Sequence, residues 1–163
     1  MRLRTSGARD THAVGAGIAA LLRTGDVVVL SGDLGAGKTV LAQGIAAGLG
    51  VTDRVVSPTF ALARRYEGRV PLHHLDVYRL DRVQEAIDLG LEELLGDGVV
   101  VVEWGEGVHE LLPADRLDVG LALDDTDENA RVVTLTGHGA GWAARAAELE
   151  SRVAAARSGA DPC

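Results

Sequence analysis

A glycine-rich segment that carries one lysine and one threonine is the stretch of this chain best suited to chemistry. Residues 32–39 read GDLGAGKT, which fits the phosphate-loop pattern G-x-x-x-x-G-K-[ST]. The three glycines leave room for backbone N–H groups to converge on phosphate oxygens, and they permit positive φ angles. Lys38 would reach the β- and γ-phosphates, and the Thr39 hydroxyl would coordinate Mg²⁺. The segment therefore predicts a site for the phosphates of a nucleotide.

The lysine of this segment stands out in the composition. Lys38 is the only lysine of the chain, and the other 15 of its 16 basic residues are arginines. A guanidinium is a flat fork whereas an ammonium is a compact point charge, so a tight phosphate cradle can require lysine. The alternative is a glycine-rich turn with a solvated lysine. The motif, its context and the uniqueness of Lys38 together favour the phosphate site.

The segments on either side of the loop are those that a phosphate site needs. Val27–Leu30 is an apolar run of the length of a buried strand. Val40–Leu49 is compatible with a helix that stops at Gly50. A helix that begins near Lys38 would point its N-terminal dipole at the same phosphates. Strand, glycine loop and helix form the context that separates a phosphate loop from a chance match.

A second strand ends in an acidic residue. Four valines at 99–102 predict a strand buried on both faces, which is typical of a parallel sheet. Phosphate-loop enzymes place the carboxylate that faces Mg²⁺ at the C-terminal end of such a strand. Here it is Glu103 rather than the commoner Asp, and we favour this role over a surface residue. Trp104 either covers the nucleotide pocket or fills the core.

The segment between these two elements holds further candidates. Thr59 is either a switch residue that senses the γ-phosphate through Mg²⁺ or simply the start of a strand. Asp76 ends a predicted strand and is suited to positioning water or to supporting Mg²⁺ indirectly. His74 lies two residues earlier and therefore on the same face. No third ligand stands nearby, so a transition-metal site is disfavoured.

The remaining periodicity predicts an α/β fold of the phosphate-loop NTPase class, with a mixed, mainly parallel central sheet, helices on both faces and antiparallel hairpins. A helix is expected from Asp10 or Thr11 to about Arg23, with Thr11 most simply its N-cap and a ligand contact the minority interpretation. Two hairpins are also expected, one of 60–66 with 70–76 and one of 116–123 with 131–136. Short helices are expected over 82–89 and 106–112. An amphipathic helix is expected over 142–157, with Trp142, Ala146, Leu149 and Val153 on one side.

Length and composition limit the class of protein. The 163 residues suggest a single domain over 1–157, with a disordered tail at 158–163. No apolar run approaches the ~20 residues of a membrane span, the first residues lack the apolar middle of a signal peptide, and the one cysteine, Cys163, forms no intrachain disulfide. These features suggest the cytoplasm. The net charge of −8 argues against a protein that grips nucleic acid alone.

Five stretches together resemble one known family. The segments GDLGAGKT (32–39), SPTF (57–60), HLDVYRL (74–80), EAIDLGLEE (85–93) and VVEW (101–104) match the TsaE (YjeE) family of bacterial ATPases in order and spacing. The combination is specific because generic phosphate-loop proteins do not share it. The resemblance covers roughly residues 10–137.

The resemblance implies an ATPase component of the machinery that forms N6-threonylcarbamoyladenosine in tRNA. It implies ATP and Mg²⁺ as ligands, and TsaB and TsaD as partners, TsaD being the subunit that transfers the threonylcarbamoyl group. tRNA would be held only through these partners. Hydrolysis could be slow in the isolated protein and faster when a partner completes the site.

The resemblance also assigns roles to individual positions. Those assigned to hydrolysis are Lys38, Thr59 and Asp76. Those assigned to the nucleotide are Thr11, Gly35, Ala36, Gly37, Lys38, Thr39, Val40, Trp104 and Arg131. Those assigned to Mg²⁺ are Thr39 and Glu103. Two positions depart from the family: Val40 stands where a second Thr is frequent, so any contact from that hydroxyl is lost, and Gly105 replaces a frequent proline.

Two other functions share the phosphate loop. A small-molecule kinase would need an acceptor pocket and usually an arginine-rich lid, whereas residues 60–80 predict a hairpin rather than a lid. A nucleotide-dependent binding module would use the same loop, with hydrolysis incidental to its work. Phosphate transfer to a nucleoside or metabolite would favour the first. Full function of a variant that cannot hydrolyse ATP would favour the second.

Overall fold

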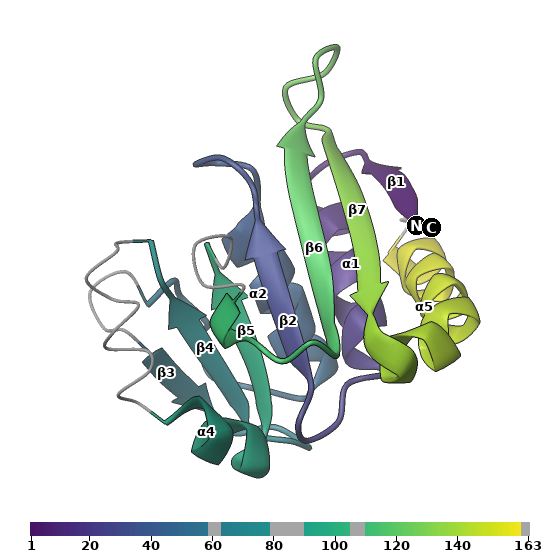
Figure 1. Ribbon diagram of the computed structural model, residues 1–163. Coiled ribbons are helices and arrows are strands. Elements are labelled where there is room, and N and C mark those ends of the chain that lie inside the picture. Colours follow the sequence, from purple (N-terminus) through teal and green to yellow (C-terminus); the bar gives the residue numbers. More distant parts are fainter. Residues whose placement is uncertain (59–62, 79–89, 105–109, 161–163) are drawn as a thin grey trace.

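The computed structural model describes residues 1–58, 63–78, 90–104 and 110–160. Its strands are β1 (Arg2–Thr5), β2 (Val27–Ser31), β3 (Ala63–Tyr66), β4 (Leu72–Asp76), β5 (Val99–Glu103), β6 (Arg116–Leu123) and β7 (Arg131–His138). Its helices are α1 (Ala8–Ala19), α2 (Lys38–Gly48), α4 (Leu91–Asp97) and α5 (Gly139–Ala160). The strands form one sheet in the order β1-β7-β6-β2-β5-β4-β3 (Figure 1).

The centre of the sheet is parallel and its edges are antiparallel. β2 lies between β5 and β6 and is parallel to both, and β4 is parallel to β5. β3 pairs antiparallel with β4, and β7 pairs antiparallel with both β6 and β1. The predicted mixed sheet and its two hairpins are confirmed. The C-terminal ends of the central parallel strands meet at one edge, which is where open α/β sheets bind ligands.

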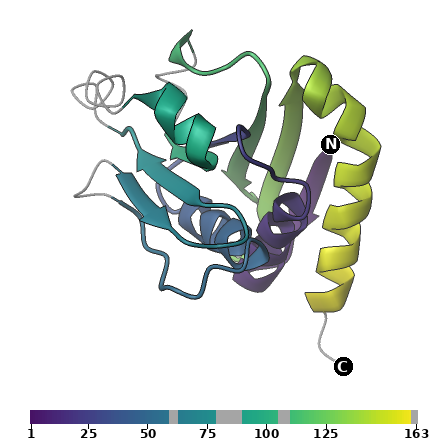
Figure 2. The same ribbon diagram turned by 90° about the horizontal axis from the view of Figure 1, so that it is seen from below.

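The two faces of the sheet carry separate apolar cores because side chains alternate along each strand. On one face, Val28 and Leu30 of β2 pack in the larger core with residues of α1, α2 and α5. On the other face, Val27 and Val29 pack in a smaller core against leucines of α4. Figure 2 shows α4 on the opposite side of the sheet from α1 and α2. This confirms the predicted helices on both faces.

Helices α1 and α2 pack against each other at backbone distance. A Cβ on Gly44 of α2 would lie 2.0 Å from the carbonyl oxygen of His12, and one on Gly15 of α1 would lie 2.3 Å from that of Leu41. A side chain at either position would therefore force the two helix backbones apart. The close packing sets the N-terminal turn of α1 beside the N-terminal turn of α2.

The start of α1 corrects one prediction. The helix begins at Ala8, its N-cap is Gly7, and it ends at Ala19, before the predicted Arg23. Thr11 is therefore not the N-cap but a buried residue of the first turn, and its hydroxyl donates to the Gly7 carbonyl oxygen at 3.1 Å. Asp10 accepts the Ser6 N–H at 3.0 Å, in the manner of a capping residue that reaches back from the first turn.

The C-terminal helix differs from its prediction in its end point and in its buried face. α5 begins at Gly139 and continues through Ala160, so residues 158–160 are helical rather than part of a disordered tail. Trp142 is buried as predicted, but Ala146 is exposed. Arg145 takes its place on the inner face: its guanidinium lies over the Trp142 ring at 3.9 Å and donates to both carboxylate oxygens of Asp26 at 2.7 and 2.9 Å.

Some predicted features fall outside the described residues. These are Thr59, the helix at 82–89 and most of the helix at 106–112. Among the helices that the structure describes, none has both the length and the apolar character needed to span a membrane.

Candidate nucleotide-binding site

The glycine loop follows β2 directly and delivers the chain into α2. Gly32, Gly35 and Gly37 have φ angles of 135°, 80° and 104°, a region that side chains with a Cβ rarely adopt. Gly32 is also limited by space, because a Cβ there would lie 2.2 Å from the carbonyl oxygen of Leu121 in β6. The loop thus has the conformation that the sequence predicted. The Ala36 N–H donates to the Asp33 carbonyl oxygen at 3.1 Å, which forms a turn within it.

Lys38, the first residue of α2, folds back across this loop. Its ammonium donates to the carbonyl oxygens of Gly32 at 2.6 Å and Asp33 at 2.8 Å. The same ammonium lies 3.7 Å from the centre of the Trp104 ring, a cation–π contact. Only 5% of the residue is exposed. The single lysine of the chain is therefore positioned at the loop, as the motif predicts.

Trp104 holds an unusual backbone conformation directly after β5. Its φ of 62° is the only positive value outside glycine among the described residues, and such a conformation strains a bulky residue. The ring is half-buried, and Tyr78 packs against it edge-on with ring centres 4.8 Å apart. Of the two interpretations left open by the sequence, a cover over the loop fits this position better than a place in the core.

Glu103 meets Thr39 across the edge of the sheet. The Thr39 hydroxyl donates to Oε1 of Glu103 at 3.3 Å, and Nε2 of His74 lies 2.8 Å from the same oxygen. Glu103 is 3% exposed and pairs in register with Leu30, two residues before the loop begins. The two residues assigned to Mg²⁺ from the sequence are thus brought together by β5 and α2.

Asp76 lies beside this pair at the end of β4. It is the register partner of Glu103 on β5 and is 3% exposed. Its two carboxylate oxygens accept hydrogen bonds from the Ser57 hydroxyl at 3.4 Å and from the Tyr78 N–H at 3.0 Å. A carboxylate buried at the parallel edge of the sheet, beside the loop, is suited to orienting water.

A pocket of about 110 Å³ adjoins the loop on the side of α1. Its lining includes Thr11, Gly35, Gly37, Val40, Asn129 and Arg131. Arg131 donates through Nη2 to the Gly35 carbonyl oxygen at 3.3 Å, and the hydroxyls of Thr5 and Thr11 lie 2.9 Å apart. The structure therefore brings Thr11, Val40 and Arg131 together at one wall of the loop, although they lie far apart in the sequence.

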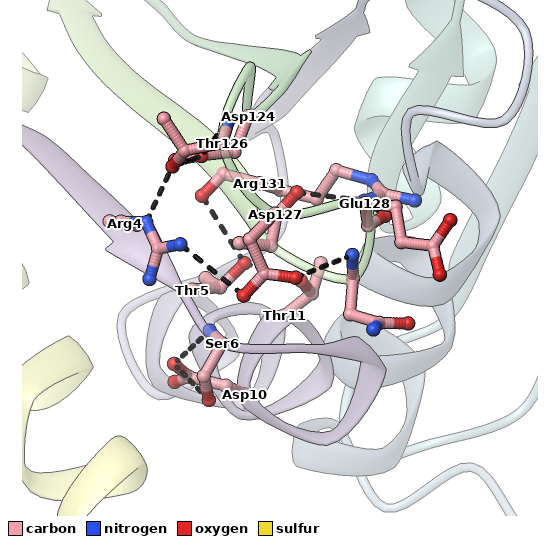
Figure 3. A network of polar contacts seen from close by, with 12 residues as sticks. Arg4, Thr5, Ser6, Asp10, Thr11, Asp124, Thr126, Asp127, Glu128 and Arg131 are labelled. Atoms are coloured by element: carbon pink, nitrogen blue, oxygen red, sulfur yellow. Dashed lines mark hydrogen bonds and ion pairs between the residues drawn. The ribbon is translucent and has the colours of Figure 1, made fainter.

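The segment between β6 and β7, which leads into Arg131 at the start of β7, is tied to β1 (Figure 3). Arg4 donates to Asp124 at 2.7 Å and to Asp127 at 3.4 Å. The hydrogen bond from the Arg4 guanidinium holds the pKa of Asp124 well below its usual range. The Thr5 hydroxyl also donates to the Arg131 carbonyl oxygen at 3.4 Å. The acidic turn therefore fastens one wall of the pocket instead of forming a separate site.

The donor set fits Mg²⁺ together with phosphate. Thr39 and Glu103 offer hydroxyl and carboxylate oxygens, which Mg²⁺ prefers, and this ion usually takes only one or two protein ligands beside phosphate oxygens. Within the described part of the chain, no three His, Cys, Asp or Glu side chains are grouped closely enough to hold a metal ion. A cation here would need ligands from a bound nucleotide.

Sequence reasoning missed the residues that support the two carboxylates. His74 was weighed only as a metal ligand, and Ser57 and the Tyr78 N–H were given no role. A signal for His74 existed: it shares a face with Asp76, on a strand that ends beside Glu103. This signal can be interpreted only when β4 and β5 are known to be neighbouring strands.

Comparisons with known proteins agree with this geometry. The family model for threonylcarbamoyl adenosine biosynthesis protein TsaE matches residues 5–133. A Streptomyces coelicolor protein is 49% identical, over 80% of this chain and 92% of the relative. A Bacillus subtilis protein is 42% identical, over 85% of this chain and 87% of the relative. Both are named tRNA threonylcarbamoyladenosine biosynthesis protein TsaE.

A solved structure is similar over nearly the whole chain. The crystal structure of YdiB from Bacillus subtilis superposes with a TM-score of 0.79 at 35% identity, covering 93% of this chain and 94% of that protein. The overall fold is thus shared with it. With the family model matched over most of its length, the chain belongs to the TsaE family, the family named for threonylcarbamoyladenosine biosynthesis.

Proposed function

We propose that this protein is the Mg²⁺-dependent ATPase of the machinery that forms N6-threonylcarbamoyladenosine in tRNA. The observation that carries the proposal is the meeting of four side chains at one edge of the sheet. Lys38 and Thr39 begin α2 at the loop, while Asp76 and Glu103 end adjacent strands beside it. Membership of the TsaE family supplies the link to tRNA modification.

In this proposal the protein acts mainly by positioning and by neutralising charge. Backbone N–H groups of the loop and the N-terminus of α2 bind the phosphates of ATP. The Lys38 ammonium exchanges its two carbonyl partners for phosphate oxygens. Thr39 and Glu103 would hold Mg²⁺, which supplies further neutralisation of phosphate charge when bound.

Asp76 orients the water that attacks the γ-phosphate. Its burial between the Ser57 hydroxyl and the Tyr78 N–H supports this role, since both hydrogen bonds fix the carboxylate in one orientation. Thr59 remains the proposed switch residue, on its position in the sequence and on the family resemblance. Thr11, Val40 and Arg131 line the pocket where the nucleoside part of ATP would lie.

The proposed partners are TsaB and TsaD. A formal net charge of −8 is unfavourable for direct contact with the phosphates of tRNA, so the partners would hold the tRNA. Completion of the site by a partner would accelerate hydrolysis. A mixture of this protein with TsaB and TsaD can therefore test both ATP hydrolysis and the assembly of the three proteins.

The deciding experiment removes the ammonium of Lys38. Lys38→Ala is expected to lower the affinity for a fluorescent ATP analogue by at least about a hundredfold and to abolish phosphate release, since a charge-assisted contact to the phosphates is lost. Binding would be measured by titration, and phosphate release with and without TsaB and TsaD. Arg152→Ala, which removes one positive charge from the exposed face of α5, is the matched control.

Unchanged ATP binding and hydrolysis in Lys38→Ala would contradict the proposal. Phosphate transfer by the wild-type protein to a nucleoside or metabolite, at a rate well above hydrolysis, would favour a kinase. Stimulation of hydrolysis by the two partners, lost in Lys38→Ala and kept in Arg152→Ala, is the result that the proposal expects.

A further inference from the structure

His74 is a buried imidazole to which the proposed hydrolysis assigns no task. It lies in β4, is fully buried, and points to the same face of the sheet as Asp76 and Glu103. Its Nε2 lies 2.8 Å from Oε1 of Glu103. Its Nδ1 is buried and has no hydrogen-bond partner among the described residues.

An imidazole in this position costs stability. A buried acceptor that gave up water without gaining a partner carries an uncompensated desolvation penalty. Leu72, two residues earlier on the same face, packs in the larger core without any such cost. An aliphatic residue in place of His74 would avoid the penalty, so the benefit of the imidazole must come from its other nitrogen.

Nε2 of His74 helps to fix the orientation of the Glu103 carboxylate. Oε1 of Glu103 accepts the Thr39 hydroxyl at 3.3 Å from α2, and Nε2 of His74 approaches it from β4. Because a carboxylate only accepts, we assign the ring proton to Nε2 and leave Nδ1 bare. Two donors from different elements hold one oxygen, which restricts the rotation of the carboxylate.

The same arrangement prepares Thr39. When its hydroxyl proton is directed to Glu103, its oxygen lone pairs stay available for a cation. A carboxylate locked by His74 therefore also locks the hydroxyl that donates to it. In metal sites, partners of this kind orient the ligands, and their loss typically weakens metal affinity by about 10–100-fold.

We propose that His74 is a positioning residue that orients Glu103, and through it Thr39, for Mg²⁺ bound with the nucleotide. This inference rests on the proposed function, because it concerns the same site. It assigns His74 neither to substrate contact nor to metal ligation. Its effect should appear in the Mg²⁺ dependence of nucleotide binding rather than in the binding of metal-free nucleotide.

The test compares three variants of His74. His74→Leu removes every donor, His74→Asn keeps a polar group too short to reach Glu103, and His74→Gln places an amide N–H near the position of Nε2. His73→Leu is the matched control: His73 is the neighbouring residue of β4, is also buried, and bonds Asp97 at 2.8 Å instead of Glu103. The probe is a fluorescent ADP analogue, titrated in EDTA and at increasing Mg²⁺.

The Leu and Asn variants are expected to raise the Mg²⁺ concentration for half-maximal enhancement of binding about tenfold or more. Their affinity in EDTA should stay within about twofold of wild type. His74→Gln and His73→Leu should stay within about threefold of wild type in both conditions. Circular dichroism establishes that each variant is folded, and if His74→Leu is not, the Asn and Gln pair decides.

Three results would overturn the proposal. One is a wild-type Mg²⁺ response in folded His74→Leu or His74→Asn. Another is an equal loss of affinity in EDTA and in Mg²⁺, which indicates damage to the loop. The third is a Gln variant as impaired as the Asn variant. These three results count against the role of His74 only if wild-type protein binds nucleotide and Mg²⁺ enhances that binding. If wild-type protein binds no nucleotide, the proposed function itself is rejected.

Discussion

Asp76 and Glu103 are two buried carboxylates whose hydrogen-bond partners separate their roles. Glu103 accepts from Thr39, the residue after the loop lysine, and so lies where the proposed Mg²⁺ would bind beside the loop. Asp76 accepts from Ser57 and from the Tyr78 N–H, neither of which belongs to the loop. At the scale of single residues, this distinction predicts that binding and hydrolysis can be separated by mutation.

Asp76→Asn should retain nucleotide binding and lose hydrolysis. The amide is nearly isosteric with the carboxylate but is a poor acceptor for the proton of an attacking water, so phosphate release should fall by about 10²–10⁴-fold. The affinity for the fluorescent ATP analogue should stay within about threefold, since Asp76 accepts its hydrogen bonds from Ser57 and from the Tyr78 N–H rather than from the loop. Titration and phosphate-release assays measure the two quantities.

The control for this prediction is Asp97→Asn, an exposed carboxylate of α4 that pairs with Arg65 and His73. It should change neither quantity. If Asp76→Asn hydrolyses ATP at the wild-type rate, the role of Asp76 is wrong. If it is inactive in hydrolysis and still supports tRNA modification with the partners, the protein works as a nucleotide-dependent binding module.

At the scale of elements, the contact between α1 and α2 decides where the pocket beside the loop forms. Gly15 and Gly44 let the two backbones touch. Thr11 of α1 then lies near Gly37, with its methyl carbon 3.8 Å from the position of a Cβ on that glycine. Widening this contact would draw Thr11 away from the loop.

Gly44→Ala should therefore lower the free energy of unfolding although alanine favours helix. The gain in helix propensity is at most about 1 kcal/mol. The added Cβ would lie 2.0 Å from the His12 carbonyl oxygen, and relieving such overlap costs about 1–3 kcal/mol. The net loss is expected to reach up to about 2 kcal/mol, measured by urea unfolding, together with weaker nucleotide binding.

Gly96→Ala is the matched control for this substitution. Gly96 also lies in a helix, α4, and a Cβ there would meet nothing within 4 Å. It should leave stability unchanged or raise it slightly. Equal stability of Gly44→Ala and Gly96→Ala would contradict the importance of the backbone contact.

At the scale of the whole molecule, an ion pair ties the last turns of α5 to the start of α1. Arg157 donates to both carboxylate oxygens of Asp10, at 2.6 and 3.0 Å, and to the Arg4 carbonyl oxygen at 2.8 Å. The hydrogen bond from Arg157 lowers the pKa of Asp10 below its ordinary value of 3.8. Asp10 in turn accepts a hydrogen bond from the Ser6 N–H. Through Asp10, α5 therefore stabilises the segment between β1 and α1, which leads into the pocket.

This pair predicts a pH-dependent contribution to stability. A carboxyl whose pKa is lower in the folded than in the unfolded chain stabilises the fold above the unfolded pKa. The contribution is lost as the pH falls through the folded pKa. Asp10→Asn should lower the free energy of unfolding by about 1 kcal/mol at pH 7, and the difference from wild type should shrink as the pH is lowered below 3.8.

Urea unfolding across this pH range measures the effect, with Glu148→Gln as control. Glu148 forms an exposed pair with Arg152 on the same helix, and its loss should change stability little at any pH. A difference between Asp10→Asn and wild type that is constant from pH 7 to pH 2.5 would contradict the assigned cause.

Local patterns predicted much of this architecture. The strand before the loop, the helix after it and the valine strand were expected within a residue or two of their observed bounds. These elements have strong local signals: apolar runs, glycines that need positive φ and a helix start at the loop. Where local signals were ambiguous, the predictions were wrong, as for the N-cap of α1 and the inner face of α5.

By itself, the sequence determined the phosphate loop, the two strands that end at the site and the family, because these depend on short local segments and on their order along the chain. The tertiary structure alone decided which distant side chains meet. It set His74 against Glu103, Arg131 against Gly35, and Arg145 rather than Ala146 against the protein interior. Such contacts depend on strand order, register and helix rotation, which are fixed only when the whole chain packs.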